Sequence, residues 1–96
     1  MSVKIKASKP IFEIKKGEKV KVNGGELEVD AHYVLIEHKD SKGKKINEMV
    51  IELFDAKRDE DFQLRYFEEN IEDRIEFFKL EGDFMYVPVD LEKVEW

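Results

Sequence analysis

The chain has 96 residues, with 17 Lys and Arg, 23 Asp and Glu and no Cys, and its formal net charge is −6 at pH 7. A chain this short has room for one hydrophobic core, so we expect a single domain over residues 1–96. The absence of Cys excludes disulfide scaffolds, thiolate metal sites and cysteine nucleophiles. Lys and Glu dominate and Thr is absent, a composition that is typical of hyperthermophile proteins and that bears on stability rather than on function.

The N-terminal third has the pattern of β-strands. Apolar and polar residues alternate with period two at residues 3–7 and 18–22. Pro10 separates the first of these strands from a short strand that we expect at residues 11–14, and Lys16-Gly17 forms the turn into the next one.

Apolar runs in this chain are short. None approaches the ~20 residues that span a bilayer, and the first ten residues lack the apolar segment of a secretory signal. We therefore expect a cytoplasmic protein that makes no membrane contact.

The clearest local signal is Asn23-Gly24-Gly25, which lies between two alternating segments and predicts a hairpin turn. A two-residue loop at Asn23-Gly24 or at Gly24-Gly25 places Val20 opposite an apolar residue of the next strand. A three-residue loop would place Val22 opposite Glu26 and bury a charge, so the pattern excludes it.

A long central hairpin is predicted next, with strands at residues 26–38 and 46–55 joined by a loop at residues 39–45. The middle of each strand, at residues 33–36 and 49–51, is apolar on both faces. Such strands need cover on both sides. In a chain of this length the second face is covered by closure of a barrel, by a helix, or by a second copy of the chain. A homodimer is therefore one of three arrangements that the pattern allows.

Residues 59–80 fit two structures. As a helix, they place five apolar residues on one face, and Gly82 lies just beyond the end. As strands, they alternate apolar and polar residues, start a turn at residues 68–70, and pair residues 75–80 with 83–89. Four further apolar residues would lie on the polar face of the helix, so the pattern favours strands.

The whole pattern predicts a mainly β fold, a small antiparallel barrel or sandwich of about seven to eight short strands around the hairpin 26–38/46–55. The alternative is an α+β fold with one amphipathic helix at about residues 60–80 packed on the sheet. Pro88 has no amide proton, so its strand either lies at an edge of the sheet or has ended by that residue, and an edge strand is the simpler interpretation. Residues 91–96 have the spacing of a final turn or strand.

Charge is divided unevenly along the chain. Residues 1–22 carry seven Lys against two Glu, whereas residues 59–96 carry a net charge of −9. Outward lysines of the N-terminal strands and lysines of the 39–45 loop could contact the phosphates of a nucleic acid. The candidate residues for this contact are Lys4, Lys6, Lys19, Lys21, Lys42, Lys44 and Lys45. Acidic residues across the first hairpin and the lack of aromatic residues among these lysines weigh against it.

No arrangement of residues predicts catalysis. His32 and His38 lie roughly 20 Å apart on one extended strand, too far to share a metal ion, and Asp30 with His32 needs a third ligand from elsewhere. The three Ser have no His close in sequence, and neither an EF-hand nor a phosphate-binding loop pattern is present. We therefore expect no catalytic residue, no cofactor and no metal ligand.

These exclusions leave a non-catalytic β-rich domain that binds a protein partner or itself, through an exposed strand edge or through its acidic C-terminal face. The alternative is a small nucleic-acid-binding domain that uses the candidate lysines. An enzyme based on carboxylates, or on Asp30 and His32 with a metal ion, is the third hypothesis.

Overall fold

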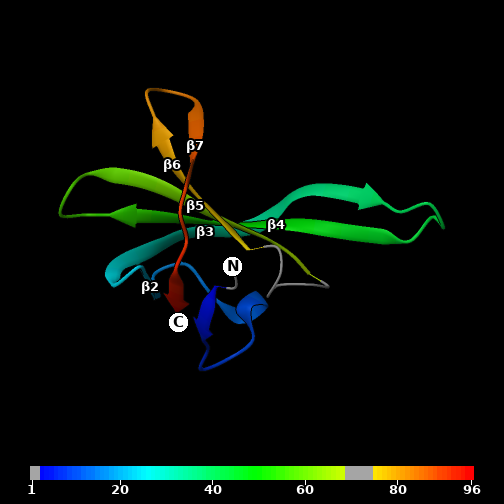
Figure 1. The fold of residues 1–96 in the computed structure, drawn as a ribbon, viewed down its shortest axis with the longest axis horizontal. Coiled ribbons are helices and arrows are strands. Elements are labelled where there is room, and N and C mark those ends of the chain that lie inside the picture. Colours follow the sequence, from blue (N-terminus) through cyan, green and yellow to red (C-terminus); the bar gives the residue numbers. More distant parts are fainter. Residues whose placement is uncertain (1–2, 69–74) are drawn as a thin grey trace.

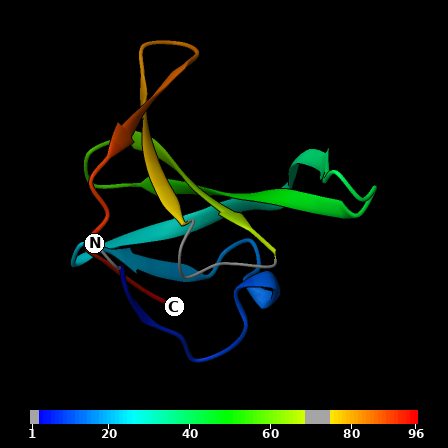
Figure 2. The same cartoon turned by 45° about the vertical axis from the view of Figure 1, so that its right-hand side comes forward.

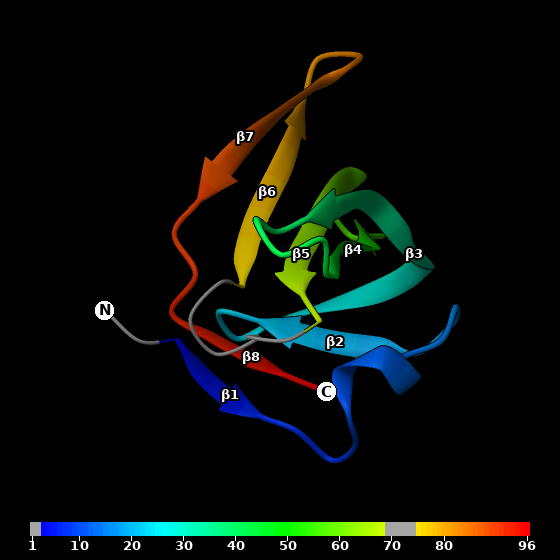
Figure 3. The same cartoon turned by 90° about the vertical axis from the view of Figure 1, so that its right-hand side faces the viewer.

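The fold is a single curled sheet. A computed structural model describes residues 3–68 and 75–96, and these residues form eight strands in the order β1-β8-β2-β3-β4-β5-β6-β7. The strands are β1 (Lys4–Lys6), β2 (Lys19–Val22), β3 (Gly25–Lys39), β4 (Lys45–Asp55), β5 (Glu60–Phe67), β6 (Glu76–Glu81), β7 (Met85–Val89) and β8 (Lys93–Glu95). The sheet curls, and because its end strands β1 and β7 do not pair with each other, it forms a half-barrel rather than a closed barrel (Figure 3).

The predicted mainly β fold is confirmed, and the alternative helix over residues 60–80 is wrong. The described part of that segment forms β5 and β6, which pair antiparallel. The predicted hairpin at Gly82 is also present, because β6 pairs with β7 and Gly82 adopts a φ of 68° that favours glycine. The predicted turn at residues 68–70 extends beyond the described residues.

The first hairpin follows the sequence prediction. Val22 lies opposite Gly25, so the loop is the two-residue Asn23-Gly24. Both loop residues have positive φ, 51° and 87°, which is the geometry of a type I′ turn and explains the preference for Asn-Gly. Val20 lies opposite Leu27, as the register argument requires, and both side chains are buried.

The central hairpin is the longest feature of the molecule. Strands β3 and β4 extend one residue further at the loop end than the predicted ranges, and their outer half projects from the body along the longest dimension of 45 Å (Figures 1 and 2). The register of β3 against β4 shifts twice, between Val29 and Ala31 and between Val34 and Ile36. Each shift leaves one extra residue in β3, so Asp30 and Leu35 form β-bulges.

The hydrophobic core fills the concave side of the sheet. It combines residues from β2, β3, β4, β5, β6 and β8 with the segment that precedes β2 and with Ile75, which directly precedes β6. The buried core residues are Ile11, Ile14, Val20, Val22, Leu27, Val29, Ile51, Leu53, Leu64, Tyr66, Ile75, Phe77 and Val94. The C-terminal residue closes one side, because Trp96 donates its indole N–H to the carbonyl oxygen of Lys9 at 2.7 Å.

Two sequence predictions about the ends of the chain need correction. Residues 11–13 form a short 3₁₀ helix rather than a strand, because the amides of Glu13 and Ile14 bond the carbonyl oxygens three residues before them. This turn directs both Ile11 and Ile14 into the core, which an extended strand could not do at that spacing. The sheet is also not purely antiparallel, because β1 pairs with β8 in parallel.

The edge position of Pro88 is confirmed, since β7 is the last strand of the sheet. In the described part of the chain, no helix has the length and apolar character needed to cross a membrane.

Candidate functional site

The outer half of the central hairpin has a strand edge that is unpaired within residues 3–68 and 75–96. Strand β2 pairs with β3 only at residues 25–28. Beyond it, the Gly17 amide donates to the carbonyl oxygen of Val29 and the Val29 amide donates to that of Glu18, and the contact ends there. From Asp30 to Lys39, no strand of the described chain pairs with the outer edge of β3. We call residues 31–49 the arm.

The arm exposes apolar side chains on both faces. Tyr33 is 41% exposed, Val34 47% and Ile36 48%. Tyr33 and Val34 are consecutive in an extended strand, so they point to opposite faces. The bulge at Leu35 then returns Ile36 to the face of Tyr33, since Ile36 lies opposite Glu48 and Tyr33 lies opposite Val50. A long apolar edge of this kind is a template for pairing with another chain.

Charged residues flank this apolar segment. The Tyr33 hydroxyl donates a hydrogen bond to Oε1 of Glu52 at 2.6 Å, which, with partial burial, raises the pKa of Tyr33 to about 12. Lys45 lies 3.2 Å from Glu37 near the tip. Asp30 and Lys39, at the two ends of the free edge, are both exposed and form no ion pair with another described residue.

The convex face beside the arm continues with an arginine and aromatic rings. Arg65 and Tyr33 flank Val50 in one cross-strand row, and Val50 is fully buried although it lies outside the main core. The Arg65 guanidinium lies 4.2 Å from the ring centre of Phe78 and 5.7 Å from that of Tyr86. Tyr and Arg are among the residues that are enriched in protein interfaces.

The candidate lysines fall into separate groups. Lys4 and Lys6 of β1 and Lys21 of β2, two strands that β8 separates, line a hollow of about 340 Å³. Lys93 of β8 joins them, and the sequence reasoning missed it because the parallel pairing of β1 with β8 carries no local signal. The group includes one acidic side chain, that of Glu95, 3.9 Å from Lys6.

The other candidate lysines are not part of this group. Lys19 lies 3.5 Å from Glu28, across the first hairpin. Lys42, Lys44 and Lys45 lie in and beside the loop at the tip of the arm, away from β1 and β8 (Figure 1). The seven predicted residues therefore do not form one basic surface.

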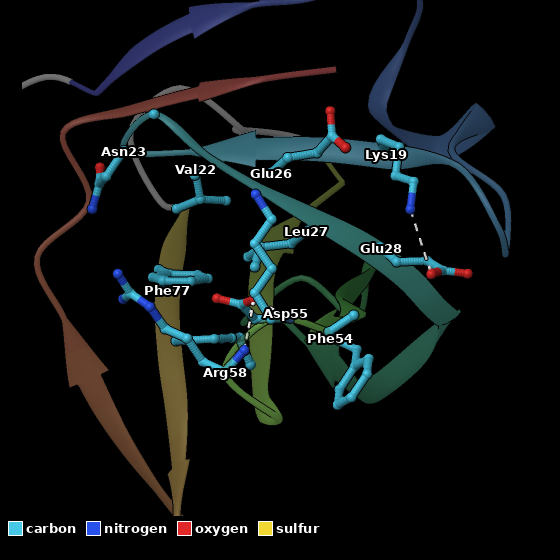
Figure 4. A pocket seen from close by; sticks show the side chains of 15 residues that line it. Lys19, Val22, Asn23, Glu26, Leu27, Glu28, Phe54, Asp55, Arg58 and Phe77 are labelled. Carbon is cyan, nitrogen blue, oxygen red and sulfur yellow. Dashed lines mark hydrogen bonds and ion pairs between the residues drawn. The ribbon is translucent and has the colours of Figure 1, made fainter.

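A pocket of about 750 Å³ opens between the first hairpin and the loop that joins β4 to β5 (Figure 4). Val22, Leu27 and Phe77 lie on its apolar side. The carboxylate of Asp55 accepts hydrogen bonds from the backbone amides of Lys57 and Arg58, and these bonds fix the conformation of the loop between β4 and β5. The described lining residues include no Ser, His or Cys, and their charges are of both signs.

His32 has no free nitrogen. Its Nδ1 lies 2.8 Å from the carbonyl oxygen of Ile14 and its Nε2 lies 2.6 Å from the hydroxyl of Tyr66. The hypothesis that His32 and Asp30 bind a metal ion therefore lacks a vacant lone pair on His32. Among the described residues, no group of three or more His, Cys, Asp or Glu is arranged to hold a metal ion.

Comparison with known proteins identifies no relative. No protein-family model, no curated protein and no solved structure matches the chain.

Proposed function

We propose that this protein is a non-catalytic interaction domain that binds a protein partner, or a second copy of itself, through the arm. The single observation that carries the proposal is the exposure of Tyr33, Val34 and Ile36 on both faces of a strand whose outer edge pairs with no other described strand. A partner strand added to this edge would satisfy the backbone groups and cover the apolar side chains at the same time. The cytoplasmic location expected from the sequence stays a prediction.

Site-specific photo-crosslinking in cells tests the proposal. A photoreactive phenylalanine analogue at Tyr33 is expected to form a discrete protein adduct. The matched control places the same analogue at Phe84, which is 93% exposed at the tip of the β6–β7 hairpin and lies outside the arm. Equal adduct yields at the two positions, or none at Tyr33, would remove the support for the arm as the contact surface.

One specific observation supports the alternative that the protein binds nucleic acid. Lys4 of β1 lies directly opposite Lys93 of β8, and like charges in this position repel each other unless an anion lies between them. Binding of labelled oligonucleotides at low and at physiological salt tests this alternative, because contact with phosphates weakens steeply as salt increases. Absence of binding at low salt would exclude it.

A further inference from the structure

We propose that the partner of the arm is a second copy of this chain, and that the two β3 strands pair antiparallel about a two-fold axis between Val34 and Leu35. This inference rests on the proposed function of the arm and names its occupant. In this register Tyr33 lies opposite Ile36 of the second copy, and Asp30 lies opposite Lys39 of the second copy. Each of these pairs occurs twice, as an isologous interface requires.

The bulge at Leu35 places the residues that this register pairs on the same face of the sheet. Residues that face each other across an antiparallel pair lie on the same face of the sheet. In a regular strand Tyr33 and Ile36 would lie on opposite faces, because their numbers differ by three. The extra residue at Leu35 places both on the convex face, so the two aromatic and β-branched pairs can form there.

Charge complementarity supports the same register. Asp30 and Lys39 end the unpaired edge, are exposed, and form no ion pair with another described residue of their own chain. They are nine positions apart along an extended strand, a separation of roughly 30 Å, so they cannot contact each other within one chain. In the symmetric pair they meet at both ends of the new strand contact.

The mass in solution gives the first test. Light scattering of the purified chain, from about 1 to about 100 micromolar, is expected to show a shift from 11.4 kDa toward twice that mass. Ile36→Lys introduces a charge into the apolar contact and is expected to raise the dissociation constant about 100-fold. The matched control is Val87→Lys on edge strand β7, where Val87 is 37% exposed, and it is expected to leave the dissociation constant unchanged.

A charge exchange tests the register itself. Asp30→Lys and Lys39→Asp are each expected to weaken the dimer by about tenfold, because each places like charges opposite one another. The double variant restores opposite charges and is expected to recover the affinity of the original chain. Recovery needs contact between the two positions, which only a second copy can provide.

The outcomes separate this inference from the proposed function. A monomeric mass at every concentration overturns the pairing, and photo-crosslinks from Tyr33 to a different protein would then leave the arm as a contact surface. A dimer that tolerates Ile36→Lys, or that does not recover in the double variant, also overturns this pairing. Failure of both the dimer and the crosslinks overturns both proposals.

Discussion

The buried hydroxyl of Tyr66 donates a hydrogen bond to Nε2 of His32 over 2.6 Å. The other ring nitrogen, Nδ1, lies 2.8 Å from the carbonyl oxygen of Ile14. A carbonyl oxygen only accepts, so Nδ1 carries the proton and Nε2 is the acceptor. The chain of bonds joins β5, β3 and the segment before β2, which gives His32 a structural role in holding three parts of the half-barrel together.

Replacing Tyr66 with Phe is therefore expected to destabilise the fold. The change leaves Nε2 of His32 without its donor in a partly buried site, which costs about 1–3 kcal/mol of unfolding free energy. Urea unfolding measures this loss. The matched control is Tyr33→Phe, which removes an exposed hydrogen bond to Glu52 and is expected to cost less than about 1 kcal/mol. Equal losses in the two variants would contradict a structural role for the buried pair.

Alkaline pH is expected to weaken the fold through the tyrosines. The hydrogen bond to Glu52 and partial burial raise the pKa of Tyr33 from 10.0 to about 12, and burial raises the pKa of Tyr66 and of Tyr86. The neutral hydroxyl is thus favoured in the folded state. The contribution of Tyr33 to stability is fully present below pH 10 and is lost as the pH rises to about 12.

Urea unfolding at a series of pH values checks this window. The unfolding free energy is expected to fall above pH 10, and to fall less steeply in Tyr33→Phe, which has one tyrosine fewer to ionise. If the variant loses stability with the same slope as the original chain, Glu52 does not hold the Tyr33 hydroxyl in its neutral form.

The sequence predicts those elements whose signals are local. Asn23-Gly24 defines its turn because both residues tolerate positive φ, and the alternation in residues 62–66 identifies β5. The 3₁₀ helix at Ile11 was missed because its direction depends on a core formed by distant strands. Pairing between β1 and β8 joins the two ends of the chain, and no pattern in either segment specifies it.

The site was only partly predictable for the same reason. Apolar residues at 33–36 on both faces indicate a strand whose two faces both need to be covered, and in the structure three of these residues are exposed on the arm. The role of Leu35 as a bulge could not be read from its identity, because a bulge depends on the register against β4. Lys93 likewise joins the lysines of β1 and β2 only through strand pairing.

Asn23 is expected to stabilise the fold through its side chain as well as through its turn. Its Nδ2 donates to the carbonyl oxygen of Asp90, and its Oδ1 accepts the amides of Glu92 and Lys93, which fixes the segment that leads into β8. Asn23→Gly preserves the positive φ but removes these three bonds, so we expect a loss of about 1–3 kcal/mol.

The control for this prediction is Asn23→Asp, measured in the same urea unfolding experiment. Aspartate retains the acceptor for Glu92 and Lys93 and tolerates positive φ, but it cannot donate to Asp90. Its stability is expected to lie between those of the original chain and Asn23→Gly. A Gly variant as stable as the original chain would show that the turn alone determines the contribution of this position.

Arg65 is expected to stabilise the convex face through its planar shape. Its Nε and Nη2 both donate to Oε1 of Gln63, at 3.0 and 2.8 Å, while its guanidinium stacks on Phe78. Gln63 is 5% exposed, so Arg65→Ala leaves a buried acceptor unpaired and is expected to cost about 1–3 kcal/mol. Arg65→Lys is expected to recover less than half of this loss, because an ammonium group cannot present two parallel donors and a stacking face together.

Thermal and urea unfolding of these variants are compared with Arg58→Ala, which removes an exposed guanidinium of the loop between β4 and β5 and is expected to change stability by less than about 0.5 kcal/mol. If Arg65→Lys is as stable as the original chain, positive charge alone accounts for the role of Arg65. If Arg65→Ala matches Arg58→Ala, the hydrogen bonds to Gln63 contribute nothing to folding. Partial recovery by Lys supports the geometry in which one side chain both satisfies Gln63 and covers the ring of Phe78.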